Sequence, residues 1–136
     1  MLKTIPNHVS ISGSGTPCFF LHGGPGMDSS YFFPYLEPLT KIFQCHLIDL
    51  RGCGRAPRLD RSEYTTEKML QDLEVYRKQC GFEKIVLLGH SFGAVLAIEY
   101  ALAFPQNVQA LILVATAARS DFLRDTTRNA KQFPEV

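Results

Sequence analysis

The sequence predicts an α/β protein, in which a mostly parallel β-sheet is covered by helices on both faces. Short apolar runs without polar alternation recur along the 136 residues, as strands buried on both faces require. Amphipathic or alanine-rich segments of helical length separate these runs. Alternation of the two segment types is typical of a parallel sheet with helical crossovers, and the length fits one domain.

Five elements are expected in the first part of the chain. They are a strand over 9–11, a turn over 13–15, a buried strand over 18–21, a helix over 29–39 and a buried strand over 45–50. The helix is expected to be short or broken, because Pro34 and Pro38 lie within it and proline disrupts a helix interior.

The second part of the chain repeats the alternation. Its expected elements are a helix beginning at Thr65 or Thr66, a buried strand over 85–88, an alanine-rich helix over about 92–104 and a buried strand over 108–114. Either threonine suits the N-cap of the first helix, and Gly81 suits its C-terminal stop. That helix carries an apolar stripe of Met69, Leu70, Leu73 and Tyr76, and its polar side carries Glu67, Gln71, Glu74 and Lys78.

Composition and charge argue against several classes of protein. The 14 basic and 13 acidic residues are mixed along the chain and leave a net charge of +1, so nothing indicates a nucleic-acid-binding surface or an electrostatic membrane anchor. The N-terminus has no apolar core of signal-peptide length, and the longest apolar run, over 108–118, is too short to span a bilayer. We therefore expect a cytoplasmic protein. The four cysteines lack the close spacing of zinc sites and are expected to be free thiols; no metal or cofactor is expected.

The strongest chemical signal is Gly89-His90-Ser91-Phe92-Gly93, which lies between a buried strand and an alanine-rich helix. A serine on so sharp a strand-to-helix turn has strained backbone angles, and the positions two residues away need glycine to avoid collision. The turn would raise Ser91 above the sheet edge at a helix N-terminus, where the Phe92 N–H is free to bind an oxyanion. We interpret Ser91 as a nucleophile; the alternative is a glycine-flanked turn with an incidental serine.

A second signal, His22-Gly23-Gly24-Pro25-Gly26, follows an earlier buried strand. Glycines let backbone N–H groups approach an oxyanion, because no Cβ blocks them. In hydrolases with a nucleophile elbow, the second oxyanion donor comes from an earlier loop after a strand. Gly23 and Gly24 are therefore the candidate donors, and His22 and Gly26 are expected to shape the loop.

Together these residues resemble the α/β-hydrolase fold and, within it, the proline iminopeptidase branch. That branch is marked by the HGGPG loop and by an Asp-x-Arg-Gly-Cys-Gly-Arg loop, which stands here at 49–55. The resemblance runs from about Pro17 to Ala117. It implies a serine hydrolase that acts through an acyl-enzyme on Ser91, on a small-molecule or short peptide substrate, with N-terminal proline peptides as the leading class.

Two positions depart from the pattern of that branch. Ala56 stands where serine is usual, and Phe92 stands where tryptophan is common. The elbow His90-Ser91-Phe92 fits esterases and other carbon-bond hydrolases of the same fold equally well. An esterase or another such hydrolase is therefore the alternative function.

The resemblance implies a catalytic triad in the order serine, acid, histidine. No histidine follows Ser91, and Asp121 stands where some relatives place the acid. Asp49 and Arg51 are interpreted as loop-shaping residues, because Asp49 can accept hydrogen bonds from its loop and Arg51 can bridge neighbouring loops. The catalytic acid and histidine are therefore expected to be absent from this chain.

The resemblance also divides the chain. It places the N-terminal part of the hydrolase core at 1–118 and the start of a cap region, or a disordered tail, at 119–136. The sheet would then stop after about the sixth strand of the fold, and the apolar strand over 108–114 would be an exposed edge that invites self-association. We expect a truncated hydrolase that is inactive alone; the alternative of another class is a non-catalytic fragment that binds a partner.

Overall fold

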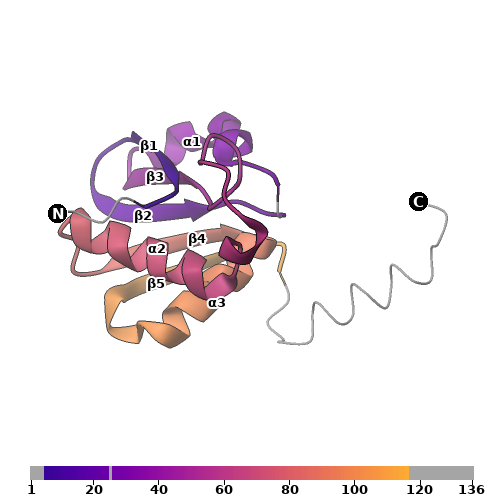
Figure 1. Ribbon diagram of the computed structural model, residues 1–136. Coiled ribbons are helices and arrows are strands. Elements are labelled where there is room, and N and C mark those ends of the chain that lie inside the picture. The colour runs from indigo at the N-terminus through magenta and orange to yellow at the C-terminus, as the bar shows by residue number, and fades with distance from the viewer. Residues whose placement is uncertain (1–4, 25, 117–136) are drawn as a thin grey trace.

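The computed structural model describes residues 5–24 and 26–116. Five strands within these residues form one sheet. Its strands are β1 (His8–Ser12), β2 (Thr16–Leu21), β3 (Phe43–Asp49), β4 (Ile85–His90) and β5 (Val108–Val114). In space they follow the order β1-β3-β2-β4-β5, and only β1 is antiparallel to its neighbour (Figure 1). The mostly parallel sheet is confirmed. Pro25, Asp121 and the expected cap or tail at 119–136 lie outside the described residues.

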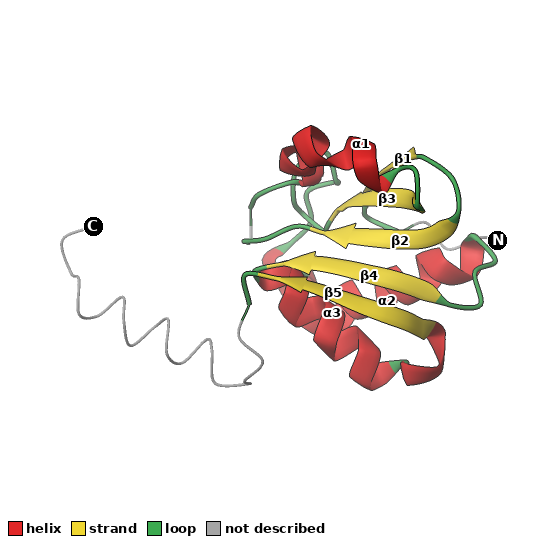
Figure 2. Cartoon of the chain, turned by 180° about the vertical axis from the view of Figure 1, so that it is seen from behind, coloured by secondary structure: helices red, strands yellow, loops and turns green. Residues whose placement is uncertain are grey.

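Helices cover both faces of this sheet. α2 (Thr66–Gln79) and α3 (Phe92–Ala103) lie together on one face and α1 (Leu36–Leu39) lies on the other, as views from opposite sides show (Figures 1 and 2). The core under α2 and α3 includes Phe19 and Leu21, and the core under α1 includes Phe20 and Leu88. Successive residues of a strand point to opposite faces, so a continuous apolar run such as β2 supplies both cores.

The segment between β2 and β3 is helical but irregular, as its prolines predict. A 3₁₀ helix spans Ser29–Tyr35 and contains Pro34, and α1 adds a single turn. The Asp28 side chain caps the 3₁₀ helix by accepting a hydrogen bond of 2.8 Å from the Ser30 N–H. Two further 3₁₀ turns lie at Arg61–Glu63 and Pro105–Asn107.

α2 begins after Thr65, whose hydroxyl oxygen accepts a hydrogen bond of 3.3 Å from the Lys68 N–H. Thr65 is therefore the N-cap, and Thr66 is the first helical residue. Gly81 follows the helix with a φ of +72°, the left-handed conformation in which glycine is favoured at a helix end.

The placement of Glu74 on the polar side of α2 is wrong. This side chain is buried and makes two hydrogen bonds with Arg77, of 2.8 and 2.7 Å, and it accepts a third of 2.7 Å from the Tyr100 hydroxyl of α3. The hydrogen bonds from Arg77 are the largest cause that lowers the pKa of Glu74 to about 2. Helical spacing within α2 does not reveal that α3 covers this side.

Neither a disulfide nor a membrane-spanning helix is found among the described residues. The four cysteines are free thiols, and no helix there is long and apolar enough to cross a membrane. Within the same residues, no three histidine, cysteine, aspartate or glutamate side chains lie close enough to hold a metal ion.

β5 is the edge strand of the described sheet, next to β4 alone. Its side chains are more exposed than those of any other parallel strand. Leu111, Leu113 and Val114 are 37%, 40% and 44% exposed. An apolar edge of this kind has unpaired backbone groups that can bind another strand.

Candidate active site

Ser91 occupies the sharp turn between β4 and α3. Its φ of 52° and ψ of −115° lie in a region that residues with a side chain rarely adopt, at a cost of about 1–3 kcal/mol. The Ser91 N–H donates a hydrogen bond of 2.9 Å to the carbonyl oxygen of Val114, at the end of β5. The turn is therefore held by a neighbouring strand as well as by the helix that follows it.

Glycine is required on both sides of this serine. A Cβ atom at Gly89 would lie 2.4 Å from the carbonyl oxygen of Gly93, and one at Gly93 would lie 2.0 Å from the carbonyl oxygen of Leu21. Both distances are far below van der Waals contact, and the atoms met are backbone atoms that cannot rotate away. These glycines let β4, α3 and the end of β2 pack closely around Ser91.

Ser91 also lies at the N-terminus of α3, which begins at Phe92. Its carbonyl oxygen accepts hydrogen bonds from the N–H groups of Ala94 (3.0 Å) and Val95 (3.3 Å). The Phe92 N–H belongs to the first residue of the helix and has no carbonyl partner within it, and the helix dipole favours negative charge at this end. The position suits the stabilisation of an oxyanion beside Ser91.

The glycine loop after β2 lies directly against this turn. A Cβ atom at Gly23 would lie 3.2 Å from Ser91 Cβ and 2.9 Å from His90 Nδ1, so the missing side chain lets the two segments meet. Gly24 and Gly26 have φ values of +53° and +96°, in the left-handed region that favours glycine. The fold thus brings together the two segments that carry the strongest signals in the sequence.

The two candidate oxyanion donors of the glycine loop differ. The Gly23 N–H is engaged, because it donates a hydrogen bond of 2.6 Å to Tyr31 Oη. The Gly24 N–H has no hydrogen-bond partner among residues 5–24 and 26–116. Sequence reasoning did not single out Tyr31, because nothing in the expected helix over 29–39 distinguishes it from the other aromatic residues there.

His22 is fully buried and anchors the glycine loop to the residue that follows β3. The Leu50 N–H donates a hydrogen bond of 3.1 Å to His22 Nε2, so the ring proton is on Nδ1, which donates 3.0 Å to the carbonyl oxygen of Gly23. Burial lowers the pKa of His22 below its ordinary value. The neutral ring can therefore keep both hydrogen bonds at neutral pH.

Asp49 is a buried acceptor of four hydrogen bonds at the end of β3. Its Oδ1 accepts from the N–H (2.9 Å) and hydroxyl (2.6 Å) of Ser29, and its Oδ2 accepts from the N–H (3.0 Å) and Nε (2.9 Å) of Arg55. Burial alone would raise the pKa of Asp49, but the hydrogen bonds from Arg55 and Ser29 hold it well below its usual range. These contacts join the loop at 51–55 to the start of the 3₁₀ helix.

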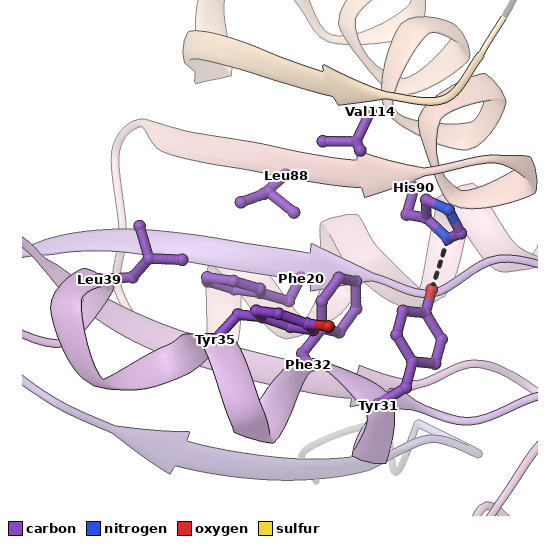
Figure 3. A pocket seen from close by; sticks show the side chains of 8 residues that line it. All are labelled: Phe20, Tyr31, Phe32, Tyr35, Leu39, Leu88, His90 and Val114. Atoms are coloured by element: carbon purple, nitrogen blue, oxygen red, sulfur yellow. Dashed lines mark hydrogen bonds between the residues drawn. The ribbon is translucent and has the colours of Figure 1, made fainter.

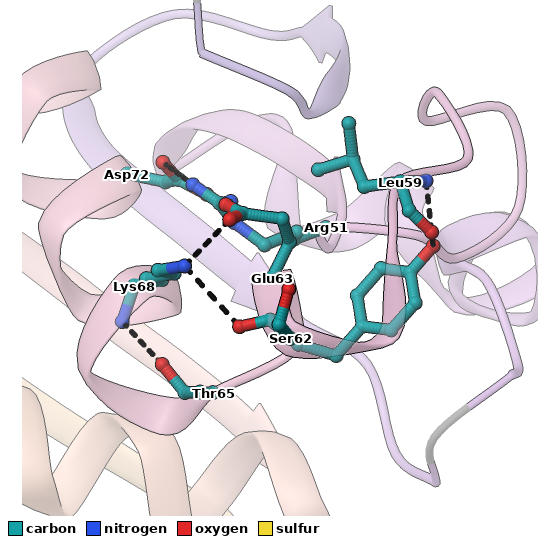
Figure 4. Close-up of polar contacts among 8 residues, drawn as sticks. Arg51, Leu59, Ser62, Glu63, Thr65, Lys68 and Asp72 are labelled. Atoms are coloured by element: carbon teal, nitrogen blue, oxygen red, sulfur yellow. Dashed lines mark hydrogen bonds and ion pairs between the residues drawn. The ribbon is translucent and has the colours of Figure 1, made fainter.

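Arg51 joins two further segments (Figure 4). Its guanidinium makes a bidentate ion pair with Asp72 of α2, at 2.8 and 2.7 Å, and a third contact of 3.0 Å with Glu63. Lys68 Nζ lies 2.7 Å from Glu63 and donates a hydrogen bond of 3.2 Å to the carbonyl oxygen of Ser62. This cluster ties the polar loop after β3 to α2.

An apolar pocket of about 320 Å³ opens beside the turn (Figure 3). Aromatic residues of the segment between β2 and β3 form one wall, and Leu88 and Val114 of the neighbouring strands form another. His90 and Tyr31 lie at one end of the pocket, with Tyr31 Oη 2.9 Å from His90 Nδ1. His90 therefore points toward Tyr31.

Ser91 has no general base in the part of the chain that the structure describes. Its hydroxyl has no hydrogen-bond partner there. His46 is buried in the core, where its Nδ1 lies 2.8 Å from the Tyr76 hydroxyl and burial lowers its pKa to about 4. His22 and His90 are engaged by the contacts described above, so none of these rings faces the serine hydroxyl as an acceptor.

Comparisons with known proteins agree with this geometry. Residues 16–135 match a family described as the alpha/beta hydrolase fold. A proline iminopeptidase of Saccharolobus solfataricus is 42% identical over 106 residues, which cover 76% of this chain and 34% of the relative. Among solved structures, a proline iminopeptidase-related protein from Thermus thermophilus has a TM-score of 0.77 at 32% identity. That match covers 85% of this chain and 42% of the Thermus thermophilus chain. An esterase from a marine microorganism has a TM-score of 0.75 at 25% identity, over 98% of this chain and 52% of its own.

These matches are one-sided in coverage. They take in most of this chain, but the chain spans only 34% and 43% of the length of two proline iminopeptidases that it resembles. The family match itself covers far more than half of the 136 residues and includes both the glycine loop and the serine turn. The chain belongs to the alpha/beta hydrolase fold family.

Proposed function

We propose that this chain carries the nucleophile and the oxyanion donors of a serine hydrolase, with Ser91 as the nucleophile. The observation that supports this most strongly is the strained backbone of Ser91, with a φ of 52°, at the N-terminus of α3 and against the glycine loop. Strain in a residue with a side chain persists only where the surroundings impose it, and it clusters at functional sites. An incidental serine in an ordinary turn would not need this conformation.

In the proposed reaction, Ser91 Oγ attacks the carbonyl carbon of the substrate, and the carbonyl oxygen becomes an oxyanion. The N–H groups of Gly24 and Phe92 donate to that oxyanion, because the Gly23 N–H is held by Tyr31. Collapse of the intermediate expels the leaving group and forms the acyl-enzyme, which water then hydrolyses.

The Ser91 proton must pass to a base and then to the leaving group. In this fold the base is a histidine oriented by a carboxylate. No histidine follows Ser91 in the sequence, and the buried rings of His22 and His46 serve other contacts. We therefore assign the acid and the base to polypeptide outside these 136 residues.

For the substrate we propose short peptides with an N-terminal proline. The support is the similarity to proline iminopeptidases, together with the HGGPG loop and the loop at 49–55. A second candidate is a carboxylic ester, because the marine esterase shares the fold and the His90-Ser91-Phe92 turn suits esterases. Both substrates would use the same acyl-enzyme chemistry at Ser91.

A fluorophosphonate probe and a hybrid enzyme test this function. The 136-residue chain alone should remain unlabelled, because it lacks a base. A hybrid in which residues 1–116 replace the matching part of the Saccharolobus solfataricus proline iminopeptidase should be labelled at Ser91 and should cleave prolyl p-nitroanilide. The Ser91→Ala hybrid is the control and should do neither.

The outcomes separate the candidate functions. Cleavage of p-nitrophenyl acetate without cleavage of prolyl p-nitroanilide would favour the esterase. Stoichiometric labelling of the isolated chain would overturn the assignment of the base to other polypeptide. A folded hybrid that is neither labelled nor active would favour a non-catalytic fragment.

A further inference from the structure

Two aromatic side chains clamp the backbone of Gly23, one at its N–H and the other at its carbonyl oxygen. The Gly23 N–H donates a hydrogen bond of 2.6 Å to Tyr31 Oη, and the Gly23 carbonyl oxygen accepts one of 3.0 Å from His22 Nδ1. Tyr31 Oη is also 2.9 Å from Nδ1 of His90, the residue before Ser91 (Figure 3). Tyr31 therefore links the glycine loop, the 3₁₀ helix and the end of β4.

The directions of these hydrogen bonds follow from the donors. A backbone N–H can only donate, so Tyr31 Oη accepts from Gly23 and has its own proton left to give. We assign that proton to the hydrogen bond with His90 Nδ1, 2.9 Å away, in which Nδ1 accepts and the His90 ring proton is on Nε2. Burial raises the pKa of Tyr31 above its ordinary value, which keeps the phenol protonated and the chain of donors intact.

We propose that Tyr31 is a positioning residue for the oxyanion site, one that holds the Gly23 N–H and fixes His90 in its Nε2–H tautomer. A loop with three glycines has large conformational freedom, and oxyanion stabilisation requires donors that are already in place. With the Gly23 N–H turned to Tyr31, Gly24 is the donor that this loop contributes. The catalytic part of this inference rests on the proposed function; the clamp itself does not.

Two matched variants isolate the Tyr31 hydroxyl. Tyr31→Phe removes one oxygen atom and can keep the ring contacts with Phe32 and His90, whose centroids lie 4.5 and 5.5 Å away. Tyr35→Phe is the control, because Tyr35 lines the same pocket but is 72% exposed. Within the described residues its hydroxyl has no hydrogen-bond partner.

The clamp can be measured on the 136-residue chain without any activity. In ¹⁵N NMR the wild-type His90 ring should have the Nε2–H tautomer, and Tyr31→Phe should shift it toward a mixture. The Gly23 amide should exchange with solvent about tenfold faster in Tyr31→Phe, as expected for the loss of one hydrogen bond. Tyr35→Phe should change neither. An Nδ1–H tautomer in the wild type, or identical spectra and exchange rates in all three proteins, would overturn the clamp.

The positioning role is tested in the hybrid enzyme. Tyr31→Phe should lower kcat by about tenfold or more with little change in KM, because the oxyanion is bound in the transition state and not with the substrate. An unchanged kcat in a variant whose Gly23 amide exchanges faster would overturn the positioning role of Tyr31. The proposed serine hydrolase function would not be affected by that result. A hybrid without any activity would count against the proposed function instead, and the NMR result would still decide the clamp.

Discussion

Gly93 is the position where a single methyl group should do most damage to the site. It lies in the first turn of α3, where the helix approaches the end of β2 most closely. A Cβ atom there would lie 2.0 Å from the carbonyl oxygen of Leu21, 2.5 Å from its carbonyl carbon and 2.7 Å from the carbonyl oxygen of His22. We predict that Gly93→Ala strongly destabilises the fold and displaces the helix N-terminus that carries Phe92.

The size of the effect follows from the contacts. Ordinary contact begins near 3.4 Å, so α3 must move away from β2 by about 1 Å or more, against backbone atoms and not flexible side chains. Overpacking of a tight core costs about 1–3 kcal/mol, and this overlap is at the severe end, so we expect a loss of at least about 3 kcal/mol. That is a large part of the stability of a small domain, which is about 5–15 kcal/mol.

Gly81→Ala is the matched comparison. Gly81 has a φ of +72° but no atom within 4 Å of the added Cβ, so it carries backbone strain without collision. The left-handed conformation costs an alanine about 1–2 kcal/mol. Gly93 has the opposite combination, since its φ lies outside the left-handed region but the added atom collides.

Urea denaturation followed by circular dichroism measures both variants. If the free energy of unfolding falls by about 2 kcal/mol per M of urea, the urea concentration at half-unfolding should fall by about 1.5 M for Gly93→Ala. It should fall by less than about 1 M for Gly81→Ala. Equal midpoints for the two variants would refute the steric argument, as would a Gly93→Ala protein within about 1 kcal/mol of the wild type.

Three further predictions concern the serine turn and its supports. Asp49→Asn should lose about 2 kcal/mol of stability near neutral pH, because hydrogen bonds to a charged acceptor are lost. The pKa of Asp49 is lowered in the fold, so the decrease in urea midpoint caused by this substitution should become smaller as the pH falls below about 4. A decrease that does not change with pH would contradict this prediction. Ser91→Gly should raise the urea midpoint by the equivalent of about 1 kcal/mol, because glycine relieves the positive φ, and the Ser91→Ala control should not. Leu113→Lys, on the exposed edge strand β5, should reduce the self-association that sedimentation velocity measures. The control Leu102→Lys, on the exposed side of α3, should leave self-association unchanged. Equal effects of the two substitutions would show that β5 is not the interface.

Much of the fold could be predicted because its signals are local. The apolar runs of β2, β3 and β4 are continuous since both faces of these strands are buried, and the glycines at 89 and 93 mark a turn that no other residue can make. The broken helix over 29–39 follows in the same way from its prolines. These features depend on residues a few positions apart, which a sequence displays directly.

What could not be predicted depends on contacts between distant segments. Glu74 has the spacing of a solvent-facing residue in α2. In the folded chain it is buried and accepts a hydrogen bond from Tyr100 of α3, a contact that the spacing within α2 does not reveal. Tyr31 is one aromatic residue among several until the fold sets its hydroxyl between Gly23 and His90. The order of the strands, with β3 between β1 and β2, is likewise a property of the assembled sheet.

The strain at the site also depends on the edge of the sheet. Two residues other than glycine have positive φ in the described part of the chain, Ser91 at 52° and Ala115 at 49°. Ser91 donates a hydrogen bond from its N–H to the carbonyl oxygen of Val114, the last residue of β5, and Ala115 directly follows Val114. The conformation of Ser91 is thus coupled to the pairing of β4 with an exposed edge strand. Polypeptide that covers β5 would therefore stabilise the turn that presents Ser91, in addition to any catalytic group that it supplies.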